Sequence, residues 1–357
     1  MNQTGGMPVA APHTTTINSA GRVMATVMAA LAPATLFGFW LYGWPAVYLW
    51  LITVGFAMLG EAFCLRLMGR QAAPVLFDGS AILTGWLLAV SLPPWAPWWI
   101  GAFGGLFATV LGKQVFGGLG QNLFNPAMVA RVALLISFPL QMTAWVAPLP
   151  LFSAGAPGLI AGLQITLKGV APGFDAVASA SLLGFAKTEL SRGVDLLQPL
   201  LHAPAQAWYG SRAGSLGETA AWLIAGGGVA MMFLRIITWH IPLAMLAGIA
   251  VPAAILHAVD PARYLDAGTH LLSGGAMLGA FFIATDYVTS PNTQKGQLIF
   301  GAGCGLLTWV IRTWAGYPEG VAFAVLLMNS LTPIIDSYVR PRIYGRDRKG
   351  VALEPVK

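Results

Sequence analysis

The chain has 357 residues, of which 57% are hydrophobic and only 9% are charged, and its formal net charge is +6. Soluble domains usually carry about 25% charged residues, so this composition excludes a protein whose whole surface faces water. It indicates an integral membrane protein. Because the apolar runs are long and continuous rather than alternating, we expect an all-α fold of membrane-spanning helices and not a barrel.

The N-terminal 22 residues are polar and lack a basic stretch followed by an apolar core, so no cleaved signal peptide is predicted. The two cysteines, Cys64 and Cys304, lie in separate apolar runs, which favours buried side chains over a metal site or a disulfide.

Ten apolar segments follow, and they predict about ten spans. They cover residues 23–43, 46–68, 79–93, 97–115, 126–142, 216–236, 239–258, 269–286, 298–315 and 319–338. Five spans (23–142) are separated from the other five (216–338) by a connection, 143–215. It is too long for an ordinary loop and is therefore expected to be functional or disordered. The polar segment 1–22 and a basic tail, 339–357, flank them.

The basic residues predict the orientation of the chain in the membrane. Lys and Arg collect in short cytoplasmic loops, and the tail alone contains Arg340, Arg342, Arg346, Arg348, Lys349 and Lys357. An even number of spans places both termini in the cytoplasm. The 143–215 connection then lies outside, which in a bacterial inner membrane means the periplasm.

Short stretches of the first five segments recur in the last five. The sequence GSAILTG at 79–85 is similar to GGAMLGA at 274–280, and GAFGGL at 101–106 is similar to GAGCGL at 301–306. Two halves with an odd number of spans must be inverted relative to each other, an arrangement common in transport proteins. Chance similarity between glycine- and alanine-rich helices is the alternative.

A few polar residues are candidates for chemistry. Asn122 and Asn125 precede Pro126, and their amides suit the edge of a uracil-like ring, although helix capping is the alternative. Glu61, Arg131 and Asp286 lie in or at the ends of apolar segments, where ionisable groups are costly and usually paired or functional. Arg131 in particular is expected to avoid lipid, either by facing the boundary between the halves or by extending its side chain to an end of the segment.

Three stretches carry a resemblance to a known family. They are DGSAILTGWLLAVSLPP (78–94), GGLGQNLFNPAMVARVALLISFP (117–139) and SGGAMLGAFFIATDYVTSPNTQKGQLIFGAGCG (273–305). With them the chain resembles the D-type subunits of the Rnf electron-transport complexes and, more distantly, the B-type subunits of the sodium-pumping NADH:quinone oxidoreductases. The resemblance implies two inverted five-helix repeats of the urea-transporter type. It also implies electron transfer between NADH and ferredoxin, coupled to movement of Na⁺ or H⁺.

The resemblance also implies a covalent cofactor. In this family a hydroxyl residue of the outer loop carries FMN as a phosphodiester, installed by a flavin transferase. The family motif matches this chain at Asp175, Ala180 and Ser181, which makes Ser181 the expected attachment site. Ser179 stands where the family has glycine and is the alternative site, and Lys187 is expected to offset the phosphate charge.

The resemblance carries two further expectations. Asn122 and Asn125 match asparagines that hold riboflavin in the related pump, so a second flavin is expected near them. The expected partners are Rnf subunits of the A, B, C, E and G types, the flavin transferase and the lipid bilayer, but no nucleic acid. A channel or solute transporter on the same frame, or a flavin-free structural subunit, are the alternative functions.

Overall fold

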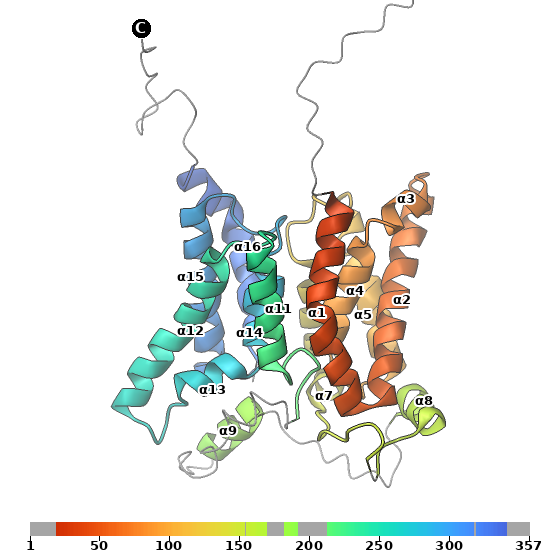
Figure 1. Ribbon diagram of the computed structural model, residues 1–357. Helices are drawn as coiled ribbons and strands as arrows, with labels where there is room; N and C mark the ends of the chain where they lie inside the picture. The colour runs from red at the N-terminus through yellow and green to blue at the C-terminus, as the bar shows by residue number, and fades with distance from the viewer. Residues whose placement is uncertain (1–18, 154, 170–181, 192–212, 318, 341–357) are drawn as a thin grey trace, which may run out of the picture.

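Figure 1 shows the computed structural model of the chain, which describes residues 19–153, 155–169, 182–191, 213–317 and 319–340. All regular structure in these ranges is helical, as the sequence predicts. Five of the helices are long and apolar enough to cross a membrane: Ala20–Tyr42, Trp44–Leu67, Trp98–Phe116, His240–Val259 and Val321–Tyr338. The protein is therefore a multi-pass helical membrane protein.

Each of the ten predicted segments coincides with at least one helix. The first half contains α1 (Ala20–Tyr42), α2 (Trp44–Leu67), α3 (Ala72–Leu76), α4 (Ser80–Ser91), α5 (Trp98–Val110), the 3-10 turn η1 (Gln114–Phe116), α6 (Pro126–Ser137) and α7 (Pro139–Thr143). The second half contains α11 (Ala221–Phe233), α12 (His240–Val259), α13 (Ala267–Leu272), α14 (Ala276–Leu278), the π-helical turn η2 (Gly279–Ile283), α15 (Gln294–Trp314) and α16 (Val321–Tyr338).

Two predicted spans are interrupted in the structure. The segment 126–142 breaks between α6 and α7, because Pro139 lacks an amide hydrogen and disfavours a helical conformation at the preceding residue. The segment 269–286 breaks at Gly274 and Gly275, whose φ angles are 61° and 66°. Only glycine adopts this left-handed conformation readily, so the glycine pair ends one helix and permits the next to start at a new angle.

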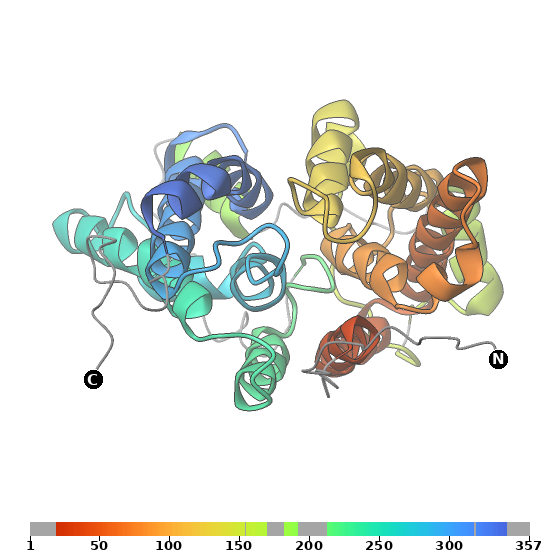
Figure 2. The same cartoon turned by 90° about the horizontal axis from the view of Figure 1, so that it is seen from above.

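The two halves lie side by side and meet along two helix pairs (Figure 2). One pair is α1 with α11, and the other is α6 with α16. These are the first and last long helices of each half. The halves therefore share a boundary that runs from one side of the molecule to the other.

Glycines bring two helices close together within each half. In the first half, a Cβ added to Gly105 of α5 would lie 2.5 Å from the carbonyl oxygen of Thr53 in α2. In the second half, a Cβ on Gly301 of α15 would lie 2.7 Å from the carbonyl oxygen of Ile241 in α12. Such small-residue contacts let helix backbones approach closely in a membrane, where packing replaces the hydrophobic effect.

The start of α1 and the end of α16 lie on the same side of the molecule, here called the inner side (Figure 1). Two further helices, α8 (Leu159–Lys168) and α9 (Leu182–Ser191), lie on the opposite, outer side. Both belong to the long connection 143–215, which the sequence had predicted only as a loop. The helices α8 and α9 thus lie on the side opposite to the start of α1 and the end of α16, in agreement with an even number of crossings.

Candidate functional site: two cavities between the halves

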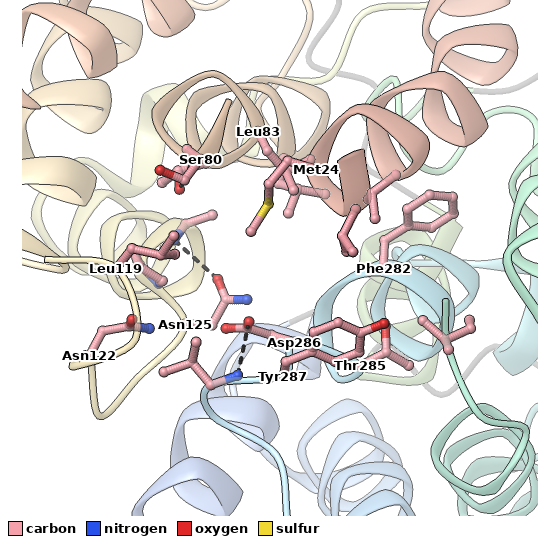
Figure 3. A pocket seen from close by; sticks show the side chains of 18 of the residues that line it. Met24, Ser80, Leu83, Leu119, Asn122, Asn125, Phe282, Thr285, Asp286 and Tyr287 are labelled. Carbon is pink, nitrogen blue, oxygen red and sulfur yellow. Dashed lines mark hydrogen bonds between the residues drawn. The ribbon is translucent and has the colours of Figure 1, made fainter. Parts of the chain in front are cut away.

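The larger cavity opens at the inner end of the boundary between the halves. It encloses about 770 Å³ of space not filled by atoms, part of it open to the surroundings. Side chains from α1, α4, the start of α6, the end of α11 and the segment after η2 line it, and Figure 3 shows them around the space. Most of these side chains are apolar. The polar ones are Ser80, Thr84, Lys113, Asn122, Asn125, Thr285, Asp286 and Tyr287.

Asn122 and Asn125 both line this cavity and both are buried. Asn125 caps α6, since its Oδ1 accepts hydrogen bonds from the amides of Ala127 (3.1 Å) and Met128 (3.3 Å). Asn122 donates from Nδ2 to the carbonyl oxygen of Phe124 at 3.0 Å. The predicted capping role is thus real for Asn125, yet both amides also stand at the wall of a cavity.

Asp286 enters the same cavity from the second half (Figure 3). Its carboxylate accepts hydrogen bonds from the amide of Val288 at 3.3 Å and from the hydroxyl of Thr289 at 3.2 Å. The backbone amide of Asn125 in turn bonds Oδ1 of Asn329 in α16, at 3.2 Å. Polar groups of both halves therefore converge on one space, which was not predictable from positions so far apart in the sequence.

A buried ion pair borders the cavity in the first half. The ammonium of Lys113 lies 2.6 Å from Oε1 of Glu61 and donates to the hydroxyl of Ser80 at 2.6 Å. Gln114 donates to the same Glu61 oxygen at 2.6 Å. Glu61 was expected to be paired, and it is. The partner was not predicted. Although Lys113 falls within the predicted segment 97–115, it lies near the end of that segment, beside a glycine-rich turn where a charge is ordinary.

A second, smaller cavity lies at the outer end of the boundary. Arg131 of α6 forms an ion pair with Glu319, just before α16, and also donates to the carbonyl oxygen of Ser91. Only 11% of each ionic side chain is exposed. Glu218, which accepts from the Ser215 hydroxyl at 2.8 Å, lines the same cavity. The prediction that Arg131 avoids lipid is confirmed, and its side chain faces the boundary between the halves.

Lys187 is part of α9 on the outer side. Its ammonium donates to the carbonyl oxygens of Ile311 (3.3 Å), Ala315 (2.5 Å) and Tyr317 (2.6 Å), at the end of α15. Asp175, Ser179, Ala180 and Ser181, the rest of the predicted flavin site, lie outside the described residues. Within the described residues, no group of three or more His, Cys, Asp and Glu side chains is placed to hold a metal ion.

The second half also contains a buried cation that the sequence did not single out. Arg312 of α15 donates to the carbonyl oxygens of His270 (2.6 Å), Ser273 (2.7 Å) and Gly274 (2.6 Å). Its position near the end of an apolar segment could have identified it as a costly charge, as it did for Arg131. Its partners, however, are backbone oxygens, and backbone oxygens leave no signal in a sequence.

The fold and the cavities define a class: a helical membrane protein of two halves, with polar sites at both ends of their boundary. Comparison with known proteins narrows this class. The pattern of the NQR2, RnfD, RnfE family matches residues 8–345, so the chain belongs to that family.

Three relatives are each named as the D subunit of an ion-translocating oxidoreductase complex. The protein of Halorhodospira halophila is 55% identical over 97% of this chain and 97% of its own length. The protein of Stutzerimonas stutzeri is 53% identical over 95% and 96%, respectively. The protein of Citrobacter koseri is 43% identical over 94% and 97%.

Proposed function

We propose that this protein is the D subunit of an ion-translocating oxidoreductase complex and that it carries electrons through FMN bound covalently to Ser181. The observation that carries the proposal is the match, over nearly the whole length of both chains, to proteins named as that subunit. The substrates proposed for the complex are NADH and ferredoxin, with Na⁺ or H⁺ as the transported ion.

The attachment site rests on the sequence around Ser181. The hydroxyl follows Ala180 directly and lies six residues after Asp175, in the connection whose two described helices lie on the outer side. A transferase could reach such a connection without entering the membrane. A flavin exchanges electrons singly or in pairs, and a covalent bond keeps it from diffusing away.

The inner cavity suits a second, noncovalent flavin such as riboflavin. Its apolar walls can cover a flat ring, and Asn122 and Asn125 present buried amides at one side of the space. Amides both donate and accept hydrogen bonds, as the pyrimidine edge of a flavin requires. The chain's part in this site is to bind and orient the ring.

The arrangement of the chain in the membrane is part of the proposal. It comprises ten spans in two inverted repeats of the urea-transporter type, in the bacterial inner membrane, with both termini cytoplasmic. The helix pairs α2–α5 and α12–α15 pack through glycines that correspond in the recurring stretches 101–106 and 301–306. Gly101 and Gly105 lie against α2, and their counterparts Gly301 and Gly305 lie against α12. In addition, each half has a buried cation that contacts the start of its recurring stretch. Lys113 donates to Ser80, the first residue of α4, and Arg312 donates to Ser273 and Gly274, just before α14. Subunits of the A, B, C, E and G types complete the proposed assembly.

The proposal is tested by detecting flavin that stays bound to the protein after denaturation. Ser181→Ala should abolish the fluorescent band of the chain in a denaturing gel and stop electron flow, while the complex still assembles. Ser179→Ala should leave the band and so serves as the matched control. A band lost only in Ser179→Ala would move the attachment to that residue. No band in the unaltered chain, with a peptide mass lacking FMN, would support a flavin-free structural subunit.

A further inference from the structure

The helix α9 is fixed to the second half at its centre by Lys187. The three carbonyl oxygens that receive its hydrogen bonds belong to the last turn of α15, to the residue after it and to the turn that follows. The last carbonyl groups of a helix lack partners within the helix, and a cation near them is favourable. Lys187 thus occupies a cation-binding position at the C-terminal end of α15.

The same helix makes a second contact one turn earlier. Leu183 is buried, and its Cδ1 atom lies so near Gly274 that a Cβ there would approach it to 2.7 Å. Ala186 is buried too, with 1% of its surface exposed, whereas Thr188 on the same helix is exposed. One face of α9 therefore packs on the protein, and two points of attachment fix both its position and its rotation.

The place where α9 docks adjoins the outer cavity. Gly274 lies under Leu183, lines that cavity together with Arg131 and Glu218, and accepts a hydrogen bond from Arg312. Burial, and then the nearby charge of Arg312, lower the pKa of Lys187 to about 8. At neutral pH the side chain is therefore still mainly an ammonium, with three hydrogens for three acceptors.

We propose that α9 is a docking helix and that Lys187 is its positioning residue, which holds the chain directly after Ser181 beside the outer cavity. The inference rests on the proposed function, because Ser181 is peptide-bonded to Leu182, the first residue of α9. Consecutive Cα atoms are about 3.8 Å apart, so a docked α9 limits how far a group attached at Ser181 can move. Lys187 acts through this restraint rather than by contact with the phosphate.

The experiment measures docking and flavin separately in the purified complex. A cysteine at Ala186 reports docking, because it reacts with a maleimide only when α9 leaves the protein. A cysteine at Thr188 is the matched control on the exposed face of the same helix. Lys187→Met removes the hydrogen bonds but keeps the length of the side chain, and Lys187→Arg keeps a cation with several donors.

We expect Lys187→Met to raise labelling at Ala186→Cys to the level seen at Thr188→Cys. In Lys187→Met, electron flow per bound flavin should fall several-fold while the fluorescent band stays. In Lys187→Arg, labelling at Ala186→Cys and electron flow per flavin should both stay at the level of the chain with Lys187. Unchanged labelling in Lys187→Met would overturn the anchor. Increased labelling with unchanged electron flow per flavin would overturn the positioning role. Absence of the fluorescent band in the unaltered chain would instead refute the proposed flavin, and labelling would still decide whether Lys187 docks α9.

Discussion

Arg131 and Glu319 join the two halves although 188 positions separate them in the chain. Both are largely buried, so neither charge has water to replace its partner. Removing one member of such a pair typically costs about 3–5 kcal/mol, whereas replacing both with apolar residues is often nearly neutral. The pair therefore fixes which surfaces of α6 and α16 meet, and its contribution can be measured with two variants.

We expect Arg131→Met to lower the thermal midpoint of the purified protein and to weaken the contact between the halves. Arg131→Met combined with Glu319→Leu should recover most of the loss. Thermal unfolding in detergent, monitored by size-exclusion chromatography, gives the thermal midpoints of the single and the double variant. A single variant as stable as the unaltered protein would mean that the ion pair does not hold the halves together.

The amides of the inner cavity can be tested without destroying the helix cap. Asn125→Ser keeps an oxygen that can cap α6 but removes the amide, and Asn122→Leu removes an amide that caps nothing. If these amides bind a noncovalent flavin, both variants should lose it from the purified complex and keep the covalent band. The flavin released by acid, measured by fluorescence, provides the test. Full flavin content in both variants would leave capping as the role of Asn125.

At the level of the helices, close packing through glycine should tolerate no added methyl group. Gly105→Ala places a Cβ against backbone atoms of α2, which cannot move aside as a side chain would. Overpacking of this kind costs about 1–3 kcal/mol. In Gly55→Ala, on the facing helix α2, the added Cβ meets nothing within 4 Å. This variant should be more stable by about 0.5–1 kcal/mol, because alanine loses less backbone entropy than glycine when the helix forms. Thermal midpoints that fall for the first variant and not for the second would bear this out.

The helices themselves were largely predictable from the sequence, because long apolar runs leave few other conformations in a bilayer. The breaks were not equally visible. Proline at position 139 marks one break directly, but the pair Gly274–Gly275 in an apolar run indicates close packing as readily as a change of direction. The helices α8 and α9 were missed because each is only 10 residues long and lies in a connection of mixed composition.

The candidate site was predictable residue by residue but not as an assembly. Glu61, Arg131 and Asp286 stood out because charges are costly in apolar segments. Their partners Lys113 and Glu319 lie at the ends of the predicted segments 97–115 and 319–338, where a charge is ordinary. Only the fold shows that these ends are buried against the other charged residues.

On the scale of the whole molecule, the separation of inner and outer sides predicts where the chain can be labelled. Ser153 is exposed in the connection next to the outer end of α1, and Gln71 is exposed between α2 and α3 at the inner side. A cysteine at Ser153 should react with an impermeant thiol reagent in intact spheroplasts. A cysteine at Gln71 should react only after lysis, and the unaltered chain controls for the native thiols. The opposite result would invert the proposed orientation.

One helix sets the distance that would separate the two proposed flavins. With 21 residues, α15 runs from the segment that carries Asp286 to the site of Lys187, which is about 30 Å at 1.5 Å per residue. Flavins near its two ends would be as far apart as the hydrocarbon core of a bilayer is thick, about 30 Å. No single electron-transfer step bridges such a gap. Even with both proposed flavins bound, the chain alone would therefore not pass electrons from one to the other. A neighbouring subunit would have to place an intermediate redox centre between them.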